Sequence, residues 1–291
     1  MTKRYVPTSA YFHEDRVISS IYSLTYRACR LVLRKTVGYP AFLYKYRAFS
    51  ASDEQSVRYL RHLLIDGDLW LSSPNDFNDP FDMSAAVVME GTRQECETGW
   101  KRMFAQINYS PKHKRERIAQ LLRDEVTGLQ CIKDAFRTNL QKVGVSCFTA
   151  DCKSIHMWSH YGDSHKGIAI QFEPARFAKV FTQPVRVEYR NEYPRVDWLR
   201  SSELKPVLLR KHEEWCYEKE WRLILPEMAG HYFNFNAAAI TGVVLGCKID
   251  PANEAAIQQM LAERRARKLP DIKLYRVTQH ESQYRLLLRR A

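Results

Sequence analysis

From Val143 onward, short apolar runs with the alternation typical of β-strands are separated by turns and by helical segments. Strands are predicted near 143–148, 166–172, 185–189, 220–225, 241–247, 272–278 and 284–288. Helices are predicted near 155–161, 203–217 and 252–267. Strands mixed with helices in this way are typical of α+β proteins. The pattern therefore predicts an α+β fold with a mixed, largely antiparallel sheet and flanking helices.

The first half of the chain has a different character. Strands are predicted near 42–46 and 69–71, with a helix between them that starts at the capping box Ser52-x-x-Gln55 and ends at Gly67. Residues 92–141 show helical spacing, with start signals at Thr92 and at Ser110-Pro111. We therefore predict a single α+β domain over 40–291 that carries a helical insertion at about 90–142.

Residues 1–39 precede this domain. Apolar residues recur at helical spacing between Ile18 and Leu33, and arginines lie mainly off that stripe. The segment is predicted to be a basic amphipathic arm that docks on the main body, a membrane surface or a partner.

The whole chain is basic. It has 45 Lys and Arg against 33 Asp and Glu, a net charge of +12 over 291 residues. Basic clusters include 112–117 and Arg264, Arg265, Arg267 and Lys268. Such clusters favour nucleic acid, an anionic membrane or an acidic partner such as an antitoxin, but solvated helix faces have the same composition.

The sequence predicts a cytoplasmic protein without a transmembrane segment. No apolar run approaches the roughly 18 residues of a membrane span, and no secretory signal follows the first residues. The seven cysteines are scattered and form no C-x-x-C pair, which indicates reduced thiols.

Common catalytic signatures, such as the Walker loop, are absent, and polar residues concentrate in less standard stretches. Arg47 ends the strand Leu43-Tyr44-Lys45-Tyr46-Arg47 and either binds a phosphate or caps the strand. The loop Asn78-Asp79-Pro80-Phe81-Asp82 either binds a ligand or satisfies its own backbone through Asx-turns.

Residues 156–167 hold a second group of candidates, His156-Met157-Trp158-Ser159-His160-Tyr161-Gly162-Asp163-Ser164-His165-Lys166-Gly167. His156 and His160 lie one helical turn apart, but with the upstream cysteines they match no recognised zinc spacing. Rings with a few polar groups suit a small-molecule pocket, whereas a core tryptophan among ordinary histidines is the alternative.

The third stretch is Trp215-Cys216-Tyr217-Glu218-Lys219-Glu220-Trp221-Arg222. In an extended chain Glu218, Glu220 and Arg222 point to one side, since strand side chains alternate. Two neighbouring carboxylates can divide roles, one staying ionised and one exchanging a proton. The alternative is a Glu220–Arg222 pair on a solvated face.

These stretches together resemble the bacterial family catalogued as domain of unknown function 2971. The resemblance rests on Tyr44–Arg47, Gly67–Asp82, Cys147–Thr149, Met157–Gly167 and Trp215–Ile224. It runs from about residue 42 to 250 and leaves out the arm and the basic C-terminal region. The family label itself implies no activity.

The layout is also similar to ADP-ribosyltransferase-type folds of bacterial toxin and phage-defence proteins. That similarity implies a split sheet with an Arg or His on the first strand, a Ser/Tyr motif on a central strand and a late Glu, often written E-x-E. The matching positions are Arg47, the Ser159–Tyr161 region and Glu218-Lys219-Glu220. The chain departs from the pattern at the middle motif, where it has no Ser-Thr-Ser.

The resemblance implies that the substrate is NAD, that no metal is needed, and that the catalytic residues are Glu220, Glu218 and Arg47. Arg47 would hold the pyrophosphate, Trp158 or Tyr161 would stack on a base, Glu220 would bind the ribose and Glu218 would orient the acceptor. The predicted NAD-binding residues are Arg47, Tyr46, Asn78, Asp79, Asp82, Trp158, His160, Tyr161 and His165.

The leading hypothesis is thus an ADP-ribosyltransferase or NAD glycohydrolase that acts as a toxin or phage-defence effector. The alternatives are a metal-dependent nuclease, with Asp79, Asp82, Glu218 and Glu220 as Mg²⁺ ligands, and a non-catalytic nucleic-acid-binding module. We expect the loop 78–82, His160–His165 and Glu218–Glu220 to converge on one pocket lined by Trp158.

Overall fold

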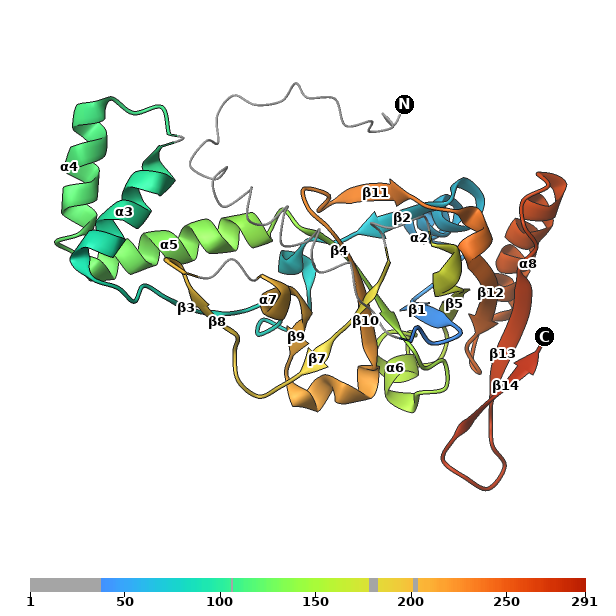
Figure 1. Ribbon diagram of the computed structural model, residues 1–291. Helices are drawn as coiled ribbons and strands as arrows, with labels where there is room; N and C mark the ends of the chain where they lie inside the picture. The colour runs from blue at the N-terminus through green and yellow to red at the C-terminus, as the bar shows by residue number, and fades with distance from the viewer. Residues whose placement is uncertain (1–37, 106, 178–182, 201–203) are drawn as a thin grey trace. The chain divides into compact units, whose positions relative to one another are not determined.

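A computed structural model of the protein describes residues 38–105, 107–177, 183–200 and 204–291 (Figure 1). The predicted basic arm falls almost wholly outside these residues. The described residues divide into two compact units, one within 86–139 and 195–203 and the other within 29–85, 140–194 and 204–291.

The first unit consists mainly of helices. They are α3 (Arg93–Phe104), α4 (Pro111–Leu121) and α5 (Glu125–Leu140), and a short parallel pair joins β3 (Ala86–Val88) to β8 (Arg195–Asp197). The predicted start signals are confirmed: Thr92 and Glu95 form a capping box, and Ser110 caps the helix that begins at Pro111. The ring of Trp100 is buried and lies 4.6 Å from that of Trp198.

The second unit is built on an eight-stranded sheet in the order β14-β13-β12-β5-β1-β4-β10-β6. These strands are β1 (Leu43–Arg47), β4 (Gly144–Thr149), β5 (Ile168–Phe172), β6 (Val185–Arg186), β10 (Glu220–Leu225), β12 (Ile240–Leu245), β13 (Lys273–Gln279) and β14 (Leu286–Arg290). All neighbours in this order are antiparallel except β12 and β13, which α8 (Pro251–Ala266) connects as a parallel pair. The α+β prediction is confirmed.

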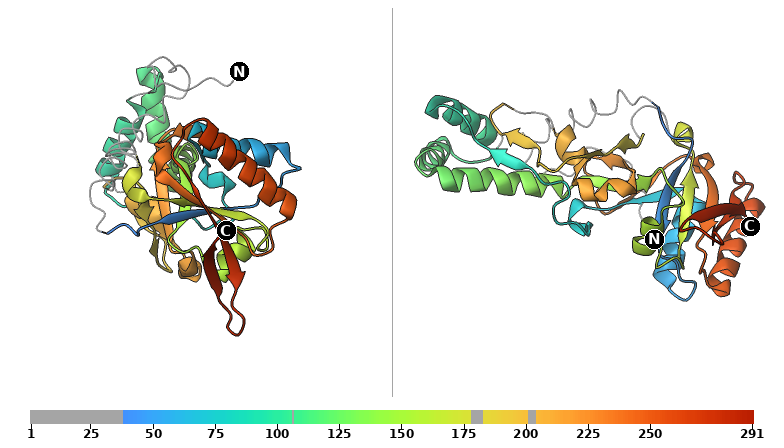
Figure 2. Two further views of the ribbon diagram at one scale, coloured as in Figure 1. Left: turned by 90° about the vertical axis from the view of Figure 1, so that its right-hand side faces the viewer. Right: turned by 90° about the horizontal axis from the view of Figure 1, so that it is seen from below.

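Two apolar layers cover the two faces of this sheet. The larger contains Leu43 and Leu223 from the strands, Leu60 from α2 (Glu54–Arg61) and Ile257 from α8. The smaller contains Tyr44 and Tyr46 with Trp158 from α6 (Ile155–His160). The β13–β14 hairpin extends away from the body of the sheet (Figure 2). Because strand side chains alternate, Leu43 lies on the face with the larger layer, and Tyr44 and Tyr46 lie on the opposite face.

Short elements complete this unit. Strands β2 (Asp68–Leu71) and β11 (His231–Asn234) pair antiparallel, and β7 (Glu188–Tyr189) and β9 (Arg210–Lys211) pair parallel. Single 3-10 turns cover Pro74–Asp76, Pro174–Arg176 and Ala237–Ala239, and a longer one covers Glu213–Glu218. In the described part of the chain, no helix is long and apolar enough to span a membrane.

Three local predictions were wrong. The helix after the first strand is capped by Asp53 and not by Ser52, and a π-helical turn over His62–Asp66 carries it to Gly67. The helix predicted over 203–217 is only α7 (Lys205–Leu209), because Arg210 is extended and starts β9. The strand predicted over 185–189 is divided into β6 and β7.

The sheet is loosest between β1 and β4. Among the described residues, Tyr44 opposite Thr149 is the single register pair between these strands, whereas β5 pairs with β1 along all five of its residues. Strands β4 and β10 pair along six residues, from Glu220 opposite Thr149 to Leu225 opposite Gly144. Beyond the pair with Tyr44, β4 is bridged by Ser72 opposite Val145 and not by β1.

Candidate functional site

The start of β10 carries two charged side chains that belong to one face of the sheet. Glu220 and Arg222 alternate with Trp221 and Leu223, and the latter two belong to the larger apolar core. Since alternate residues of a strand point to opposite faces, both charges are turned away from that core. Glu220 and Arg222 are nevertheless only 3% and 0% exposed, so the predicted pair lies buried and not on a solvated face.

A sharp turn brings Glu218 beside Glu220. Glu218 ends the 3-10 turn Glu213–Glu218, and Lys219 then adopts a left-handed conformation with φ of 46°. The ammonium group of Lys219 lies on an exposed side chain and contacts Asp151 at 2.9 Å. Both carboxylates therefore enter the same space while the lysine between them points elsewhere, but through this turn and not through the strand alternation that was predicted.

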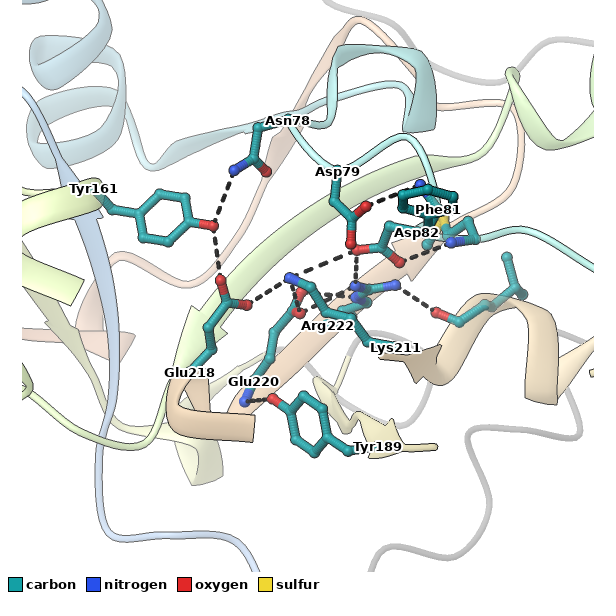
Figure 3. Close-up of polar contacts among 12 residues, drawn as sticks. Asn78, Asp79, Phe81, Asp82, Tyr161, Tyr189, Lys211, Glu218, Glu220 and Arg222 are labelled. Carbon is teal, nitrogen blue, oxygen red and sulfur yellow. Dashed lines mark hydrogen bonds and ion pairs between the residues drawn. The ribbon is translucent and has the colours of Figure 1, made fainter. Parts of the chain in front are cut away.

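Two cations hold these carboxylates in place (Figure 3). Lys211 Nζ donates to Glu218 Oε2 at 2.5 Å and to Glu220 Oε2 at 3.2 Å. Arg222 Nε donates to Glu220 Oε1 at 2.7 Å, and Arg222 Nη2 donates to Glu220 Oε2 at 3.0 Å. Both oxygens of Glu220 are thus occupied by protein cations, whereas Glu218 has one oxygen on Lys211.

The third carboxylate of the cluster comes from the polar loop that the sequence analysis identified. Asp82 Oδ2 accepts a hydrogen bond from Arg222 Nη2 at 2.6 Å and lies 3.7 Å from Lys211 Nζ. Its side chain is 2% exposed. With every group ionised, these three carboxylates and two cations carry a net charge of −1 within a buried cluster.

The surroundings shift the pKa values of the two glutamates in opposite directions. Burial raises the pKa of Glu220, but the charges of Arg222 and Lys211 lower it further, to about 2. Burial raises the pKa of Glu218 above its ordinary value, and the nearby Glu220 charge raises it too, while Lys211 lowers it only in part. Glu220 is therefore held as the anion, and the proton of Glu218 sets the charge of the cluster.

A cavity of about 460 Å³ opens above this cluster. It is lined by Tyr44, Lys45, Tyr46, Ser72, Asp76, Phe77, Asn78, Asp82, Val145, Cys147, Phe148, Thr149, Met157, His160, Tyr161, Lys211, Glu218 and Glu220. Its size lies in the range of ligand pockets, and aromatic rings with a few charged groups are typical of such pockets. The buried carboxylates thus have access to a space of ligand size.

Tyr161 links the rim of the cavity to the cluster. Its hydroxyl donates to Glu218 Oε1 at 2.7 Å and accepts from Asn78 Nδ2 at 3.4 Å (Figure 3). Burial raises the pKa of Tyr161, and the charge of Glu218 raises it further, so the phenol stays protonated. His160 stands beside it at the exposed rim, with Nδ1 3.3 Å from the hydroxyl of Tyr217.

Lys45 follows Tyr44, whose register partner on β4 is Thr149. Its Nζ donates to Ser146 Oγ at 3.0 Å and to the carbonyl of Cys147 at 3.3 Å. The residue is half-buried, yet its ammonium group is enclosed enough that burial lowers its pKa. Lys45 is the cation of β1 that lines the cavity, a place that the sequence analysis had given to Arg47.

Several predicted ligands lie outside this cavity. The guanidinium of Arg47 stacks 3.4 Å from the ring centroid of Tyr59, and Tyr59 belongs to the larger core. Trp158 is fully buried, donates its indole N–H to the carbonyl of Cys152 at 2.9 Å and packs edge-on against Tyr46. Trp158 is therefore a core residue, and it packs against Tyr46, which lines the cavity.

The remaining two predicted ligands also face elsewhere. His165 lines a different cavity, beside the β13–β14 hairpin. Asp79 Oδ1 accepts the backbone N–H of Phe81 at 2.9 Å, the Asx-turn that was the alternative for this loop, and Asp79 lines a second cavity. The loop, the 160–161 segment and the glutamate pair do converge, but without Trp158, His165 and Asp79.

Lys211, which contacts all three carboxylates, was not among the predicted site residues. It had been placed within the helix predicted over 203–217, where no neighbouring signal set it apart. Tyr189, whose hydroxyl accepts the backbone N–H of Glu220 at 2.8 Å, was not among them either. Only long-range strand pairing brings β9 and β7 to the start of β10, so local sequence carried no sign of either contact.

Comparison with known proteins identifies one segment of the chain. No curated protein and no solved structure matches the chain significantly. The family described as protein of unknown function (DUF2971) matches residues 157–223, a range that contains Tyr161, Lys211, Glu218, Glu220 and Arg222. This match agrees with the resemblance to that family that the motifs of the chain predicted.

Proposed function

We propose that the cavity binds NAD and cleaves the bond between nicotinamide and ribose, which would make the protein an ADP-ribosyltransferase or an NAD glycohydrolase. The observation that carries the proposal is the pair Glu218 and Glu220, two adjacent carboxylates with oppositely shifted pKa values at the inner end of an aromatic-walled cavity. Titratable pairs whose surroundings drive their pKa values apart are typical of acid–base sites.

A negative charge near the ribose favours the reaction, because bond cleavage makes the ribose cationic. When the C1′–N bond breaks, its electron pair leaves with neutral nicotinamide and the ribose becomes oxocarbenium-like. A fixed carboxylate stabilises that cation without having to reorganise. Glu220, which Arg222 and Lys211 keep ionised, supplies this charge to the cluster.

Glu218 then serves as the base for the acceptor. An O–H or N–H group of the acceptor, or water, bonds to C1′ and passes its proton to Glu218. A carboxylate with a raised pKa is a better base near neutral pH than an ordinary one. The hydrogen bond from Tyr161 holds Glu218 in place for this transfer.

The cavity walls supply contacts for the rest of NAD. The rings of Tyr46, Phe77 and Tyr161 line it and offer faces for stacking on a base. Because Lys45 lines the cavity and Arg47 stacks on Tyr59, we assign the contact with an anionic group of the substrate to Lys45.

The metal-dependent nuclease is the weaker alternative. Lys211 does provide a lysine beside paired acids, as such a nuclease needs. However, Lys211 and Arg222 already bond both oxygens of Glu220 and Oδ2 of Asp82, the positions that Mg²⁺ would require. The two cations thereby favour chemistry that needs fixed negative charge without a metal.

A role as a toxin or phage-defence effector follows from the ADP-ribosyltransferase resemblance, with a cytoplasmic target. If the proposal holds, induced expression in a bacterial host should lower cellular NAD or modify a cell component, and growth should stop. The same host expressing Glu220→Gln should grow normally while producing comparable amounts of folded protein.

Incubation of purified protein with lysate and NAD labelled in the adenylate phosphate tests the activity and identifies the acceptor. Label in protein, RNA or DNA indicates a transferase, and label only in free ADP-ribose indicates a glycohydrolase. Parallel incubation with Mg²⁺ and nucleic acid tests the nuclease alternative.

Two variants complete this experiment. Glu220→Gln keeps the shape and removes the charge, so it should abolish release of nicotinamide. Glu213→Gln makes the same chemical change at an exposed position of the preceding 3-10 turn and should leave release unchanged. Absence of NAD consumption by the folded wild-type protein, or cleavage of nucleic acid with Mg²⁺, would overturn the proposal.

A further inference from the structure

Helix α4 of the first unit carries a basic cluster that the proposed NAD chemistry does not use (Figure 1). Residues 112–117 contain four Lys and Arg and a single carboxylate, Glu116. Five steps along an α-helix cover only about 8 Å, so the four cations lie within two turns. We call them the basic cluster of α4: Lys112, Lys114, Arg115 and Arg117.

Two members of the cluster are exposed and nearly free of carboxylate partners. Lys112 Nζ lies 4.0 Å from Glu116, and the two side chains are 82% and 62% exposed, so solvent screens this pair. Arg115 is exposed and has no hydrogen-bond or ion-pair partner among the described residues. Because they are three residues apart, Lys112 and Arg115 share one side of the helix.

The other two members contact neutral groups. Lys114 Nζ donates to the carbonyl of Ala105 at 3.4 Å, and Arg117 Nη1 donates to Gln120 Oε1 at 2.7 Å. Neither contact neutralises the charge. The cluster therefore keeps most of its positive charge within this unit.

This charge does not stabilise the helix that carries it. The start of an α-helix favours acidic side chains and disfavours basic ones. Helices α3 and α8 follow this preference with Glu95 and Glu254 in their first turns, whereas α4 has no acidic residue there and has Lys112 directly after Pro111. The basic cluster of α4 therefore needs another explanation, such as an anionic partner.

Two rings lie beside the cluster. Tyr109 is 44% exposed and packs edge-on against the exposed His113, with ring centroids 4.6 Å apart. His113 lies one helical turn before Arg117, so the two share a face. Exposed rings beside cations are typical of surfaces that bind single-stranded nucleic acid, where bases stack on the rings and phosphates contact the cations.

Other polyanions match these observations less well. The large apolar residues of α4, Ile118 and Leu121, are buried, so the helix has no apolar side chain to insert into a membrane. In a duplex the bases are stacked on each other and are not available to Tyr109. An acidic protein would use the charges but not the rings.

We propose that this surface of α4 binds a single-stranded nucleic acid. Its phosphates contact the basic cluster, with Lys112 and Arg115 as the most accessible members, and one of its bases stacks on Tyr109. This inference goes beyond the proposed NAD chemistry and does not rest on it.

Fluorescence anisotropy of a labelled oligothymidylate, titrated with the full-length protein in the absence of NAD, tests the proposal. The matched probe is an abasic strand of the same length, which keeps the phosphates and lacks the bases. We expect the oligothymidylate to bind at least about fivefold more tightly, because stacking of one base on a ring contributes that much. An oligouridylate that binds more tightly than the oligothymidylate identifies RNA as the partner, and the reverse identifies DNA.

Two variants examine the two kinds of contact. Lys112→Gln/Arg115→Gln removes two phosphate contacts, so the slope of log affinity against log salt should become shallower by about 1.4. Tyr109→Ala should remove the preference for the oligothymidylate over the abasic strand. The control Arg58→Gln/Lys248→Gln changes the net charge equally at exposed positions of the other unit and should leave the slope unchanged.

Four results would overturn the proposal. They are no binding of the oligothymidylate at low salt, equal affinity for the oligothymidylate and the abasic strand, equal changes of slope in the two double variants, and tighter binding of polyglutamate or of phosphatidylserine vesicles. Because NAD is absent from these titrations, loss of the proposed NAD activity would not affect them, nor would their failure affect that activity.

Discussion

Arg222 and Glu220 form a buried two-point pair within one strand, with Nε 2.7 Å from Oε1 and Nη2 3.0 Å from Oε2. The two residues are separated by a single core residue and share one face of β10. Arg222 also donates to Asp82 and to the carbonyl of Leu208. One guanidinium therefore joins the polar loop, the segment before β9 and the glutamate pair.

Replacing Arg222 should destabilise the whole protein. Arg222→Met would leave Glu220 and Asp82 with only Lys211 as a cation, and removing one partner of a buried ion pair costs about 3–5 kcal/mol in unfolding free energy. Urea unfolding followed by circular dichroism measures the loss. Arg176→Met is the control, since Arg176 pairs with Glu173 at a half-exposed site and should cost under about 1 kcal/mol. Equal losses in both variants would contradict the account.

Glu220 should make stability depend on acid pH. Its folded-state pKa of about 2 lies below the ordinary value of 4.5, so ionised Glu220 contributes stability above pH 4.5 that is lost as the pH falls towards 2. This difference corresponds to roughly 3 kcal/mol of unfolding free energy. The stability gap between the wild-type protein and Glu220→Gln should be largest above about pH 5 and should close towards pH 2. A gap that stays constant over this range would show that the charge of Glu220 is not its cause.

Lys211 should set the pH at which the proposed base works. Lys211→Met removes the cation 2.5 Å from Glu218, so the pKa of that carboxyl should rise further. The acidic limb of the pH–rate profile for nicotinamide release should then move to higher pH. A variant that merely lost folded protein would lower the rate at every pH and leave the limb in place, which would argue against this role.

Two arginines at the end of α8 should contribute differently to stability: Arg264 is structural, whereas Arg265 is dispensable for folding. Arg264 is 1% exposed and donates to the carbonyls of Pro270, Leu64 and Ala237. Arg264→Ala leaves these acceptors buried and should cost about 3 kcal/mol or more. Arg265 is exposed, and Arg265→Ala should change stability by less than about 0.5 kcal/mol. Thermal unfolding of both variants checks this, and similar melting temperatures would contradict it.

Arg264 also shows that a cluster of basic residues in a sequence need not form one exposed basic surface. The run Arg264, Arg265, Arg267 and Lys268 suggested one polyanion-binding surface, but Arg264 is a core residue and Arg267 contacts Glu263 at 2.7 Å. Charge count alone cannot tell a guanidinium that satisfies backbone carbonyls from one in solvent. The salt dependence of any nucleic-acid binding therefore has to be assigned to residues such as Arg265.

Most elements of the fold could be predicted because their signals are local. Alternation predicted β10 and β12, helical spacing predicted α8, and the capping box at Thr92 predicted the start of α3. The helix predicted over 203–217 failed because Arg210 leaves the helix to pair with Glu188, a contact that helical spacing does not encode.

In the candidate site, too, the residues with local signals could be predicted, and those placed by long-range contacts could not. Glu218 and Glu220 could be paired from their spacing alone, and Asp82 and Tyr161 came from polar residues concentrated in apolar surroundings. Lys211 and Lys45 could not, because each is brought to the carboxylates or the cavity by pairing between distant strands. Conversely, Trp158 and Arg47 suited the expected chemistry by type, but packing places both against the core.

The rate of nicotinamide release by purified Glu218→Gln tests the central claim most directly. This substitution leaves the Glu220–Arg222 pair intact, so its effect on folding should be smaller than that of Glu220→Gln. With an unchanged melting temperature, the account predicts a loss of about a hundredfold or more relative to wild type, and none for Glu213→Gln. Wild-type rates in folded Glu218→Gln, or no release by the wild-type protein itself, would contradict it.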